Sequence, residues 1–228
     1  MRARRLLRIA AVGVGLFVGL SLLIVVLYRF VPPPVTPLMV LRVVEGESMR
    51  RDWLPTAALP QVIAAAVLAS EDQRFCLHDG FDYVEMDRAW QAYRAGGSLR
   101  GASTLSQQTA KNLFLLPVRS FLRKGLEAYF TVLIEAIWPK WRIAQVYLDT
   151  VEWGPGVYGV EAGSQYAFGH PAARLSRREA ALLAAILPNP RRWSAAAPTA
   201  YIRRRADIIL TRMERQEADT SCVASLGR

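Results

Sequence analysis

Cysteine and histidine are scarce in this chain of 228 residues, which contains two of each. Cys76 and Cys222 are too few for a disulfide framework or for a metal site of several thiolates, and the sequence leaves open whether they form one bridge. His78 and His170 lie far apart in the sequence, which argues against a zinc site. We therefore assign no residue as a metal ligand.

Patterns typical of β-strands and repeats are missing as well. No run alternates apolar and polar residues over the length of a strand, and there is no internal repeat. Helical patterns dominate instead, and Thr104 with Gln107, like Ser176 with Glu179, has the spacing of a capping box. The helices expected from these patterns cover residues 57–70, 104–114, 120–138, 140–151 and 176–187. The sequence thus predicts a compact, mainly α domain with long functional loops.

Acidic residues are the scarcer of the two charge types. The chain has 29 lysines and arginines against 19 aspartates and glutamates, which gives a formal net charge of +10. Such a surplus favours an anionic partner, which could be a nucleic acid, an anionic membrane surface or a phosphorylated substrate. Net charge alone does not choose among these three.

One long hydrophobic run lies near the N-terminus. Ile9 to Tyr28 carries no charge, and as a helix it would span about 30 Å, the thickness of a bilayer's hydrocarbon core. Four arginines precede the run and Arg29 follows it, a bias that predicts a cytoplasmic N-terminus and an external domain. A cleaved signal peptide is the alternative. The run is longer than the usual apolar region of a signal peptide, and no small-residue cleavage site follows it closely.

Composition divides the chain into five segments. We expect a cytoplasmic N-terminus (1–8), a transmembrane helix (9–29), a proline-rich stalk and linker (30–56), a globular domain (57–215) and a tail (216–228). Prolines at four of the positions between 32 and 37 fix φ and remove amide donors, which favours an extended stalk. The composition of the last residues favours a frayed end.

Three polar stretches carry candidate chemistry. Residues 71–80, E-D-Q-R-F-C-L-H-D-G, place an acidic pair directly after an apolar helix, which suits a general base but is also typical of a polar helix terminus. Residues 101–112, G-A-S-T-L-S-Q-Q-T-A-K-N, open a helix whose free amides favour an anion, with a solvated capped helix as the alternative. Residues 119–127, R-S-F-L-R-K-G-L-E, place cations and a carboxylate on one helical face, as an ion-paired surface helix also would.

In this order the three stretches resemble the motifs of glycosyltransferase family 51, the peptidoglycan glycosyltransferases. Those motifs read E-D-x-x-F-x-x-H-x-G, then G-x-S-T-[IL]-[ST]-Q-Q-x-x-K-N, then R-K-x-x-E, and all three stand intact in this chain. The resemblance covers about residues 57 to 200. Two positions depart from the family pattern, because Ala102 replaces a common glycine and Asp149 stands where asparagine is usual.

The resemblance implies a mainly α, lysozyme-like fold with a large head lobe and a smaller, membrane-facing jaw lobe. It also implies that a 4-hydroxyl of lipid II attacks the anomeric carbon of a lipid-linked glycan strand, with inversion and release of undecaprenyl pyrophosphate. By the matching motif positions, Glu71 would be the general base and Glu127 the second catalytic carboxylate. Binding of the substrate and its pyrophosphate would fall to Ser103, Gln107, Lys111, Arg119 and Lys124, and support of the site to Asp72, Phe75, His78 and Gly80.

The resemblance implies partners and a location as well. Lipid II and the growing lipid-linked strand are the expected substrates, and divisome or elongation proteins are candidate partners. The expected location is the bacterial inner membrane, crossed once, with the catalytic domain in the periplasm. No cofactor is expected to bind tightly, although stimulation by Mg²⁺ or Mn²⁺ is a tendency of the family. A nucleic-acid partner is not expected, because basic and aromatic residues are not interleaved.

Two other functions compete with this one. A lytic enzyme of lysozyme-like fold also uses a catalytic glutamate, but it would not need Lys111, Arg119 and Lys124 for a pyrophosphate leaving group. A catalytically silent membrane scaffold of cell-wall synthesis is compatible with the anchor, and turnover is what separates it from an enzyme. The chain has no S-x-x-K and no K-T-G sequence, so we expect a monofunctional glycosyltransferase without a transpeptidase domain.

Overall fold

The computed structural model describes residues 2–97, 101, 103–118 and 120–227. The helices in this described part are α1 (Arg2–Phe30), α2 (Pro37–Val44), α3 (Gln61–Glu71), α4 (Tyr83–Arg94), α5 (Leu105–Phe114), α6 (Phe121–Ile137), α7 (Lys140–Thr150), α8 (Val160–Phe168), α9 (Arg177–Ile186) and α10 (Ala200–Glu214). Short strands β1 (Arg50–Arg51), β2 (Glu152–Gly154) and β3 (Val157–Tyr158) and 3-10 segments at Thr56–Ala58, Phe75–Leu77, Ala172–Arg174 and Ser221–Val223 complete it. The predicted mainly α fold is confirmed.

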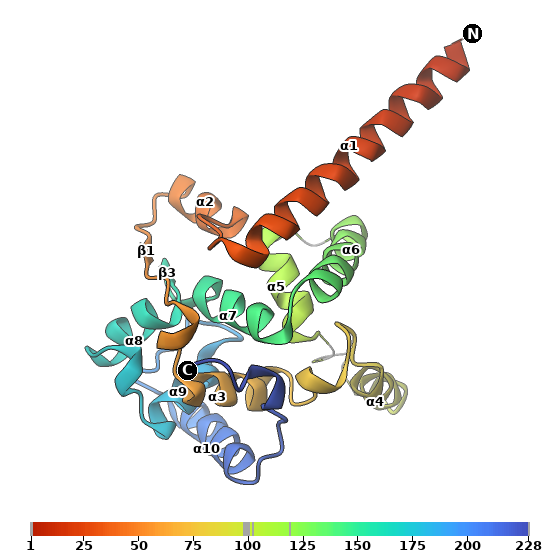
Figure 1. The fold of residues 1–228 in the computed structure, drawn as a ribbon. Coiled ribbons are helices and arrows are strands. Elements are labelled where there is room, and N and C mark those ends of the chain that lie inside the picture. Colours follow the sequence, from red (N-terminus) through yellow and green to blue (C-terminus); the bar gives the residue numbers. More distant parts are fainter. Residues whose placement is uncertain (1, 98–100, 102, 119, 228) are drawn as a thin grey trace.

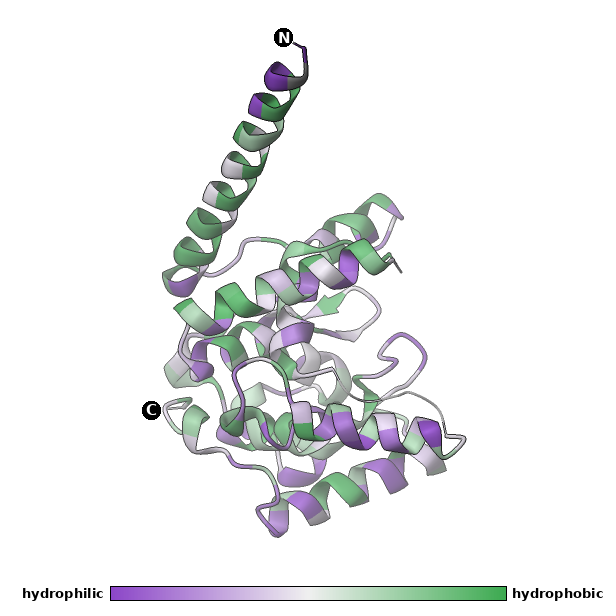
Figure 2. Ribbon diagram, turned by 90° about the vertical axis from the view of Figure 1, so that its right-hand side faces the viewer, coloured by the Kyte–Doolittle hydropathy of each residue, from purple (hydrophilic) through white to green (hydrophobic). Residues whose placement is uncertain are grey.

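Helix α1 projects from the body of the molecule as one long rod (Figure 1), and Figure 2 shows apolar residues along it with a hydrophilic N-terminal end. Its residues 4–30 are long and apolar enough to cross a membrane. The end of α1 nearest the body docks against α6 and the turn that follows α6, where Trp138 Nε1 donates a hydrogen bond to the carbonyl of Val25 at 2.7 Å. The anchor is therefore part of the domain's packing and is not joined to it by a free linker.

Helix α3 lies at the centre of the core. It packs against α9 and α10, while α5 packs against α6 and α7. Small side chains on the facing surfaces of α3 and α9 let the two backbones approach closely. The buried alanines are Ala64, Ala66 and Ala69 on α3 and Ala180, Ala181, Ala184 and Ala185 on α9. This packing fixes the C-terminal end of α3, whose last residue is Glu71.

Most helix ends follow the predicted signals. Both capping boxes are present, at the starts of α5 and α9, and Pro139 separates α6 from α7. The helix expected from residue 57 begins only at Gln61, because the residue before Pro60 is disfavoured in the α conformation. Helix α4 was not predicted. It buries none of its residues, although Tyr83, Met86, Trp90 and Tyr93 recur at helical spacing, a signal that the sequence analysis did not use.

The predicted extended stalk is partly wrong. Residues 37–44 form α2, because Pro37 suits a first turn and the side chain of Thr36 accepts a hydrogen bond from the Met39 N–H at 3.3 Å. Strand β1, from the same linker, pairs in parallel with β3, which pairs antiparallel with β2. These strands of two or three residues are too short to show an alternating pattern.

The segment expected to be a frayed tail packs against the domain instead. Cys222 forms a disulfide with Cys76, with Cα atoms 5.5 Å apart and a sequence separation of 146 residues. Val223 and Leu226 are buried, and the amide of Gly227 donates to the carbonyl of Thr56 at 2.9 Å. Two apolar residues in a polar segment form no periodic pattern, which is why the sequence did not indicate this docking.

Candidate active site

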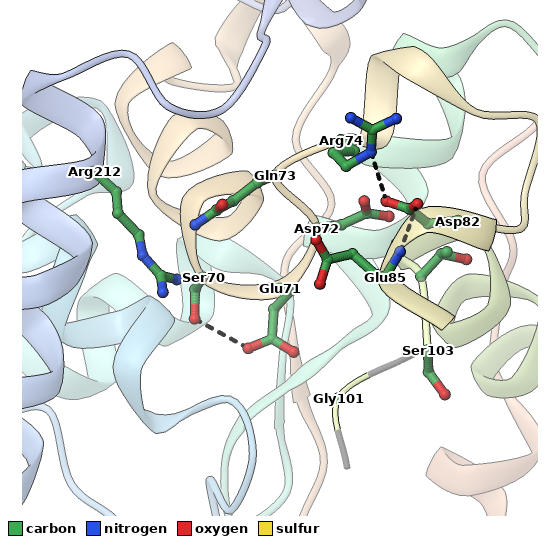
Figure 3. A pocket seen from close by; sticks show the side chains of 11 residues that line it. Ser70, Glu71, Asp72, Gln73, Arg74, Asp82, Glu85, Gly101, Ser103 and Arg212 are labelled. Carbon is green, nitrogen blue, oxygen red and sulfur yellow. Dashed lines mark hydrogen bonds and ion pairs between the residues drawn. The ribbon is translucent and has the colours of Figure 1, made fainter. Parts of the chain in front are cut away.

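Glu71 lies at the end of α3 on the wall of a cleft of about 210 Å³. In Figure 3 its carboxylate lies between Arg212 of α10 on one side and Ser103, just before α5, on the other. The lining is almost entirely polar and consists of Ser70, Glu71, Asp72, Gln73, Arg74, Asp82, Glu85, Gly101, Ser103, Thr104 and Arg212. The side chain of Glu71 is 14% exposed, so it is shielded from bulk water yet reachable from the cleft.

Hydrogen-bond donors hold the Glu71 carboxylate from two sides. Ser70 Oγ donates to Oε1 at 3.1 Å, and Arg205 Nη2 of α10 forms an ion pair with the same oxygen at 3.5 Å. On the other side Gln108 Nε2 of α5 donates to Oε2 at 3.3 Å. The hydroxyl of Tyr147, buried on α7, donates to Gln108 Oε1 at 3.3 Å and so fixes the orientation of that amide. Residues of four helices thus fix the orientation of the Glu71 carboxylate.

Asp72, the next residue, joins the loop after α3 to the start of α5. Its Oδ2 accepts a hydrogen bond from the amide of Leu105 at 2.8 Å, and its Oδ1 lies 3.0 Å from His78 Nε2. His78 Nδ1 accepts from the amide of Gly80 at 3.2 Å, so the proton of a neutral ring is on Nε2 and points at Asp72. Thr104 Oγ1 completes the brace by donating to the carbonyl of Gly80 at 2.6 Å.

Gly80 and Phe75 fit this loop against α6 and α7. Gly80 has φ +90°, and a Cβ there would lie 2.7 Å from the Cγ2 atom of Thr131, so both the conformation and the space require glycine. The ammonium of Lys140 lies 4.5 Å from the centre of the Phe75 ring and donates to the carbonyl of His78 at 2.5 Å. The four residues predicted to support the site therefore lie in one connected brace.

Asp72, His78 and Asp82 form a cluster whose candidate ligand atoms lie within 4.8 Å of one another. Both nitrogens of His78 are already used in the brace. Asp82 Oδ1 caps α4 by accepting from the amides of residues 84 and 85, and its Oδ2 lies 3.2 Å from Arg74 Nε. A cation here would have to displace Arg74 and deprive the brace of its hydrogen bonds, so these residues do not fit a resident metal ion.

A second charged centre lies on α5 and α6. Glu127 is 3% exposed, and its carboxylate pairs with Arg123 Nη1 at 2.5 Å and with Lys124 Nζ. Burial lowers the pKa of Lys111, and the positive charges of Arg123 and Lys124 lower it further, whereas the carboxylates of Glu127 and Glu71 raise it. Lys111 therefore lies within electrostatic reach of both glutamates. Three cations around the single carboxylate of Glu127 leave a positive surplus that suits an anion.

The predicted site residues do not all take the predicted positions. Ser103 is exposed and lines the cleft beside Glu71. Gln107 is buried, its Oε1 accepts from the amide of Thr104 at 3.1 Å within the capping box, and it is not among the described residues that line the cleft. Arg119 lies outside the described residues.

Four residues at Glu71 were missed in the sequence. Gln108 stands next to Gln107, and the two lie three and four residues before Lys111, so helical phase does not indicate which glutamine faces the site. Tyr147 and Arg205 gave no signal either, because the segments that carry them meet Glu71 only in the folded chain. Ser70 directly precedes Glu71, but adjacency in the sequence does not show that its hydroxyl turns to the carboxylate. Arg205 was part of a basic run that is equally typical of a solvated helix face.

Comparisons with known proteins agree with this geometry. A family model described as transglycosylase matches residues 39–214. A protein of Rhodospirillum centenum named biosynthetic peptidoglycan transglycosylase is 54% identical over 98% of this chain and 97% of its own length. Proteins of the same name from Chromohalobacter salexigens and Caulobacter vibrioides are 53% and 46% identical, over 93% and 97% of this chain and 92% and 98% of their own lengths.

Proposed function

Because this chain belongs to the transglycosylase family, we propose that it polymerises lipid II into the glycan strands of peptidoglycan, with Glu71 as the general base. The single observation that supports the role of Glu71 most strongly is its carboxylate, which faces a polar cleft and is held by donors on both oxygens. A base held in this way keeps one orientation without paying for reorganisation during the reaction.

The reaction follows from this placement. Glu71 takes the proton of the acceptor's 4-hydroxyl while that oxygen attacks the anomeric carbon of the lipid-linked strand. The bond from that carbon to the pyrophosphate oxygen breaks on the opposite face, and its electron pair leaves with undecaprenyl pyrophosphate, so the anomeric centre inverts. Gln108 and Arg205 act through Glu71 by fixing its orientation.

The cationic centre is the counterpart of the base. Negative charge builds up on the pyrophosphate as it leaves, and Lys111 of α5 together with Arg123 and Lys124 of α6 supplies positive charge around Glu127. Glu127 keeps Arg123 and Lys124 in place through its two ion pairs. Arg119 and Ser103 stay proposed substrate ligands, and we propose no tightly bound cofactor. Mg²⁺ or Mn²⁺ would enter with the pyrophosphate.

We place the domain on the periplasmic side of the inner membrane, anchored by α1. Arg2, Arg4, Arg5 and Arg8 precede the apolar run, which by the positive-inside rule keeps the N-terminus in the cytoplasm. The disulfide between Cys76 and Cys222 supports the same orientation, because such bonds persist in the periplasm and are rare in the cytosol.

Polymerisation of labelled lipid II by the detergent-solubilised chain tests this proposal, with products separated by gel. We expect long glycan from the wild type and a rate about 10² to 10⁴ times lower from Glu71→Gln, which keeps the shape but not the basicity of the side chain. Glu214→Gln, at the exposed end of α10, is the matched control and should polymerise like the wild type. Substrate binding without polymer from the wild type would instead favour the silent scaffold.

A further inference from the structure

An apolar groove of about 650 Å³ lies between α1, α2 and the adjoining parts of α5 and α6. Its walls include Leu20 and Ile24 of α1, Val40 and Leu41 of α2, and Leu113 and Phe114 of α5. Figure 1 shows these helices converging where α1 meets the body of the molecule. The groove is separate from the polar cleft at Glu71, with which it shares no lining residue.

The two small polar side chains in the groove's wall, Ser21 and Thr36, are already hydrogen-bonded. Ser21 Oγ donates to the carbonyl of Phe17 at 2.7 Å, and Thr36 caps α2. The aromatic part of the wall is ordered by ring contacts, with Phe114 and Phe130 stacked at 4.4 Å and Phe17 of α1 6.5 Å from Phe130. Apart from Tyr28 the rest of the wall is apolar, so the groove suits a hydrocarbon chain.

The groove lies at the depth of the membrane. Its wall on α1 runs from Phe17 to Tyr28, about 17 Å of helix at a rise of 1.5 Å per residue. That length is about half of a bilayer's hydrocarbon core, and it is the half nearest the domain. A groove at this depth is in contact with lipid chains and not with water.

Helix α5 connects the groove to the cationic centre. Lys111 belongs to that centre, and Leu113 and Phe114, two and three residues later, belong to the groove. Their separation along the helix axis is only about 3 to 5 Å. A molecule whose pyrophosphate is held at Lys111 would therefore have an attached hydrocarbon chain within reach of the groove.

We propose that this groove binds the isoprenoid chain of a lipid pyrophosphate, with α1 as one of its walls. The proposal rests on the function proposed above and extends it, because it gives the membrane helix a part in substrate binding as well as in anchoring. The anionic head of such a lipid matches the cationic centre, and its apolar chain matches the groove. Helix α5 connects the two sites. A phospholipid tail or a second copy of α1 would match only the apolar half.

Two valines on α2 provide a matched test. Val40 lines the groove and is 50% exposed, whereas Val43 is 49% exposed and lies outside it. Val40→Trp should fill the groove, and we expect about a tenfold higher KM for lipid II with its undecaprenyl chain at unchanged kcat. With a water-soluble analogue that carries a short chain, Val40→Trp should match the wild type, which also shows that the variant is folded. Val43→Trp should match the wild type with both substrates.

Equal KM values for Val40→Trp and the wild type with the undecaprenyl substrate would overturn the proposal, as would equal losses in both tryptophan variants. A second readout does not depend on turnover. A prenyl pyrophosphate with a photoreactive chain, bound in detergent, should label the peptide that contains Leu113 and Phe114, and undecaprenyl pyrophosphate should compete. Labelling by an acyl-chain phospholipid probe that undecaprenyl pyrophosphate does not displace would show a general lipid contact and refute the specific site. A wild-type protein that is labelled by the prenyl pyrophosphate but makes no polymer would instead refute the proposed function and leave the groove proposal standing.

Discussion

Asp149 makes the stability of the domain depend on pH. Its side chain is fully buried on α7, where Oδ1 accepts from the amide of Leu54 at 3.3 Å and Oδ2 has no partner among the described residues. Burial raises the pKa of Asp149 to about 8, against the opposing effects of the Leu54 amide and the charges of Arg51 and Arg142. At neutral pH the folded protein therefore holds a proton on Asp149 that the unfolded chain releases.

The sign and size of the effect follow from this difference. A raised pKa in the folded state contributes stability that is fully present below the ordinary pKa of 3.8 and is lost as the pH rises through about 8. At about 1.4 kcal/mol per pKa unit the upper limit is about 6 kcal/mol. Water entry and relaxation around the ionised carboxylate reduce such penalties, so we expect about 2 kcal/mol, or about 4 to 8 °C in Tm.

Asp149→Asn tests this reasoning, because asparagine resembles the neutral acid in shape and cannot ionise. Thermal unfolding in detergent, followed by tryptophan fluorescence between about pH 3.5 and pH 9, should give nearly the same Tm for both proteins at the acid end, below the ordinary pKa of 3.8. The wild type should then fall below the variant by a margin that grows up to about pH 8. Parallel curves over the whole range would show that Asp149 is already ionised in the folded protein and would refute the argument.

Two further substitutions test the docking of the C-terminal segment and the orientation of Glu71. Replacing both Cys76 and Cys222 by serine should cost about 3 to 5 kcal/mol for a loop closed over 146 residues, seen as a Tm about 6 to 20 °C lower in the absence of reductant, and an unchanged Tm would contradict a stabilising bridge. Arg205→Met should lower kcat about tenfold while KM and Tm hold, and Arg205→Lys should recover part of it. A change in KM alone would show that Arg205 binds substrate and does not position Glu71.

The parts of the site that the sequence could predict are those whose residues lie close together in the chain. The acidic pair after an apolar helix, the capping box at Thr104 and the cationic face around Glu127 each depend on neighbours within about one or two helical turns. Family resemblance then gave the order and meaning of the three stretches. Local spacing does not say which of Gln107 and Gln108 turns to the cap and which to the base, because both lie one turn before Lys111.

The parts that the sequence could not predict depend on segments that meet only after folding. Arg205 is 134 positions from Glu71, and the two cysteines are 146 apart, so no periodicity connects them. Helix α2 was not predicted because Pro37 and the prolines before it favour an extended stalk, whereas proline also favours the first turn of a helix. The groove beside α1 could not be predicted either. An apolar run has the same sequence pattern whether the helix faces lipid on all sides or forms the wall of a binding site on one side.

The disulfide between Cys76 and Cys222 joins two residues that are synthesised at different times. At synthesis rates of about 5 to 20 residues per second, Cys222 follows Cys76 by about 7 to 30 s, and the earlier thiol spends that interval without its native partner. The sequence holds no third cysteine with which it could pair wrongly. Formation of the native bond therefore needs an oxidant that accepts two electrons, and no other cysteine of this sequence competes for either thiol, so mispairing of these two cysteines can arise only between two chains.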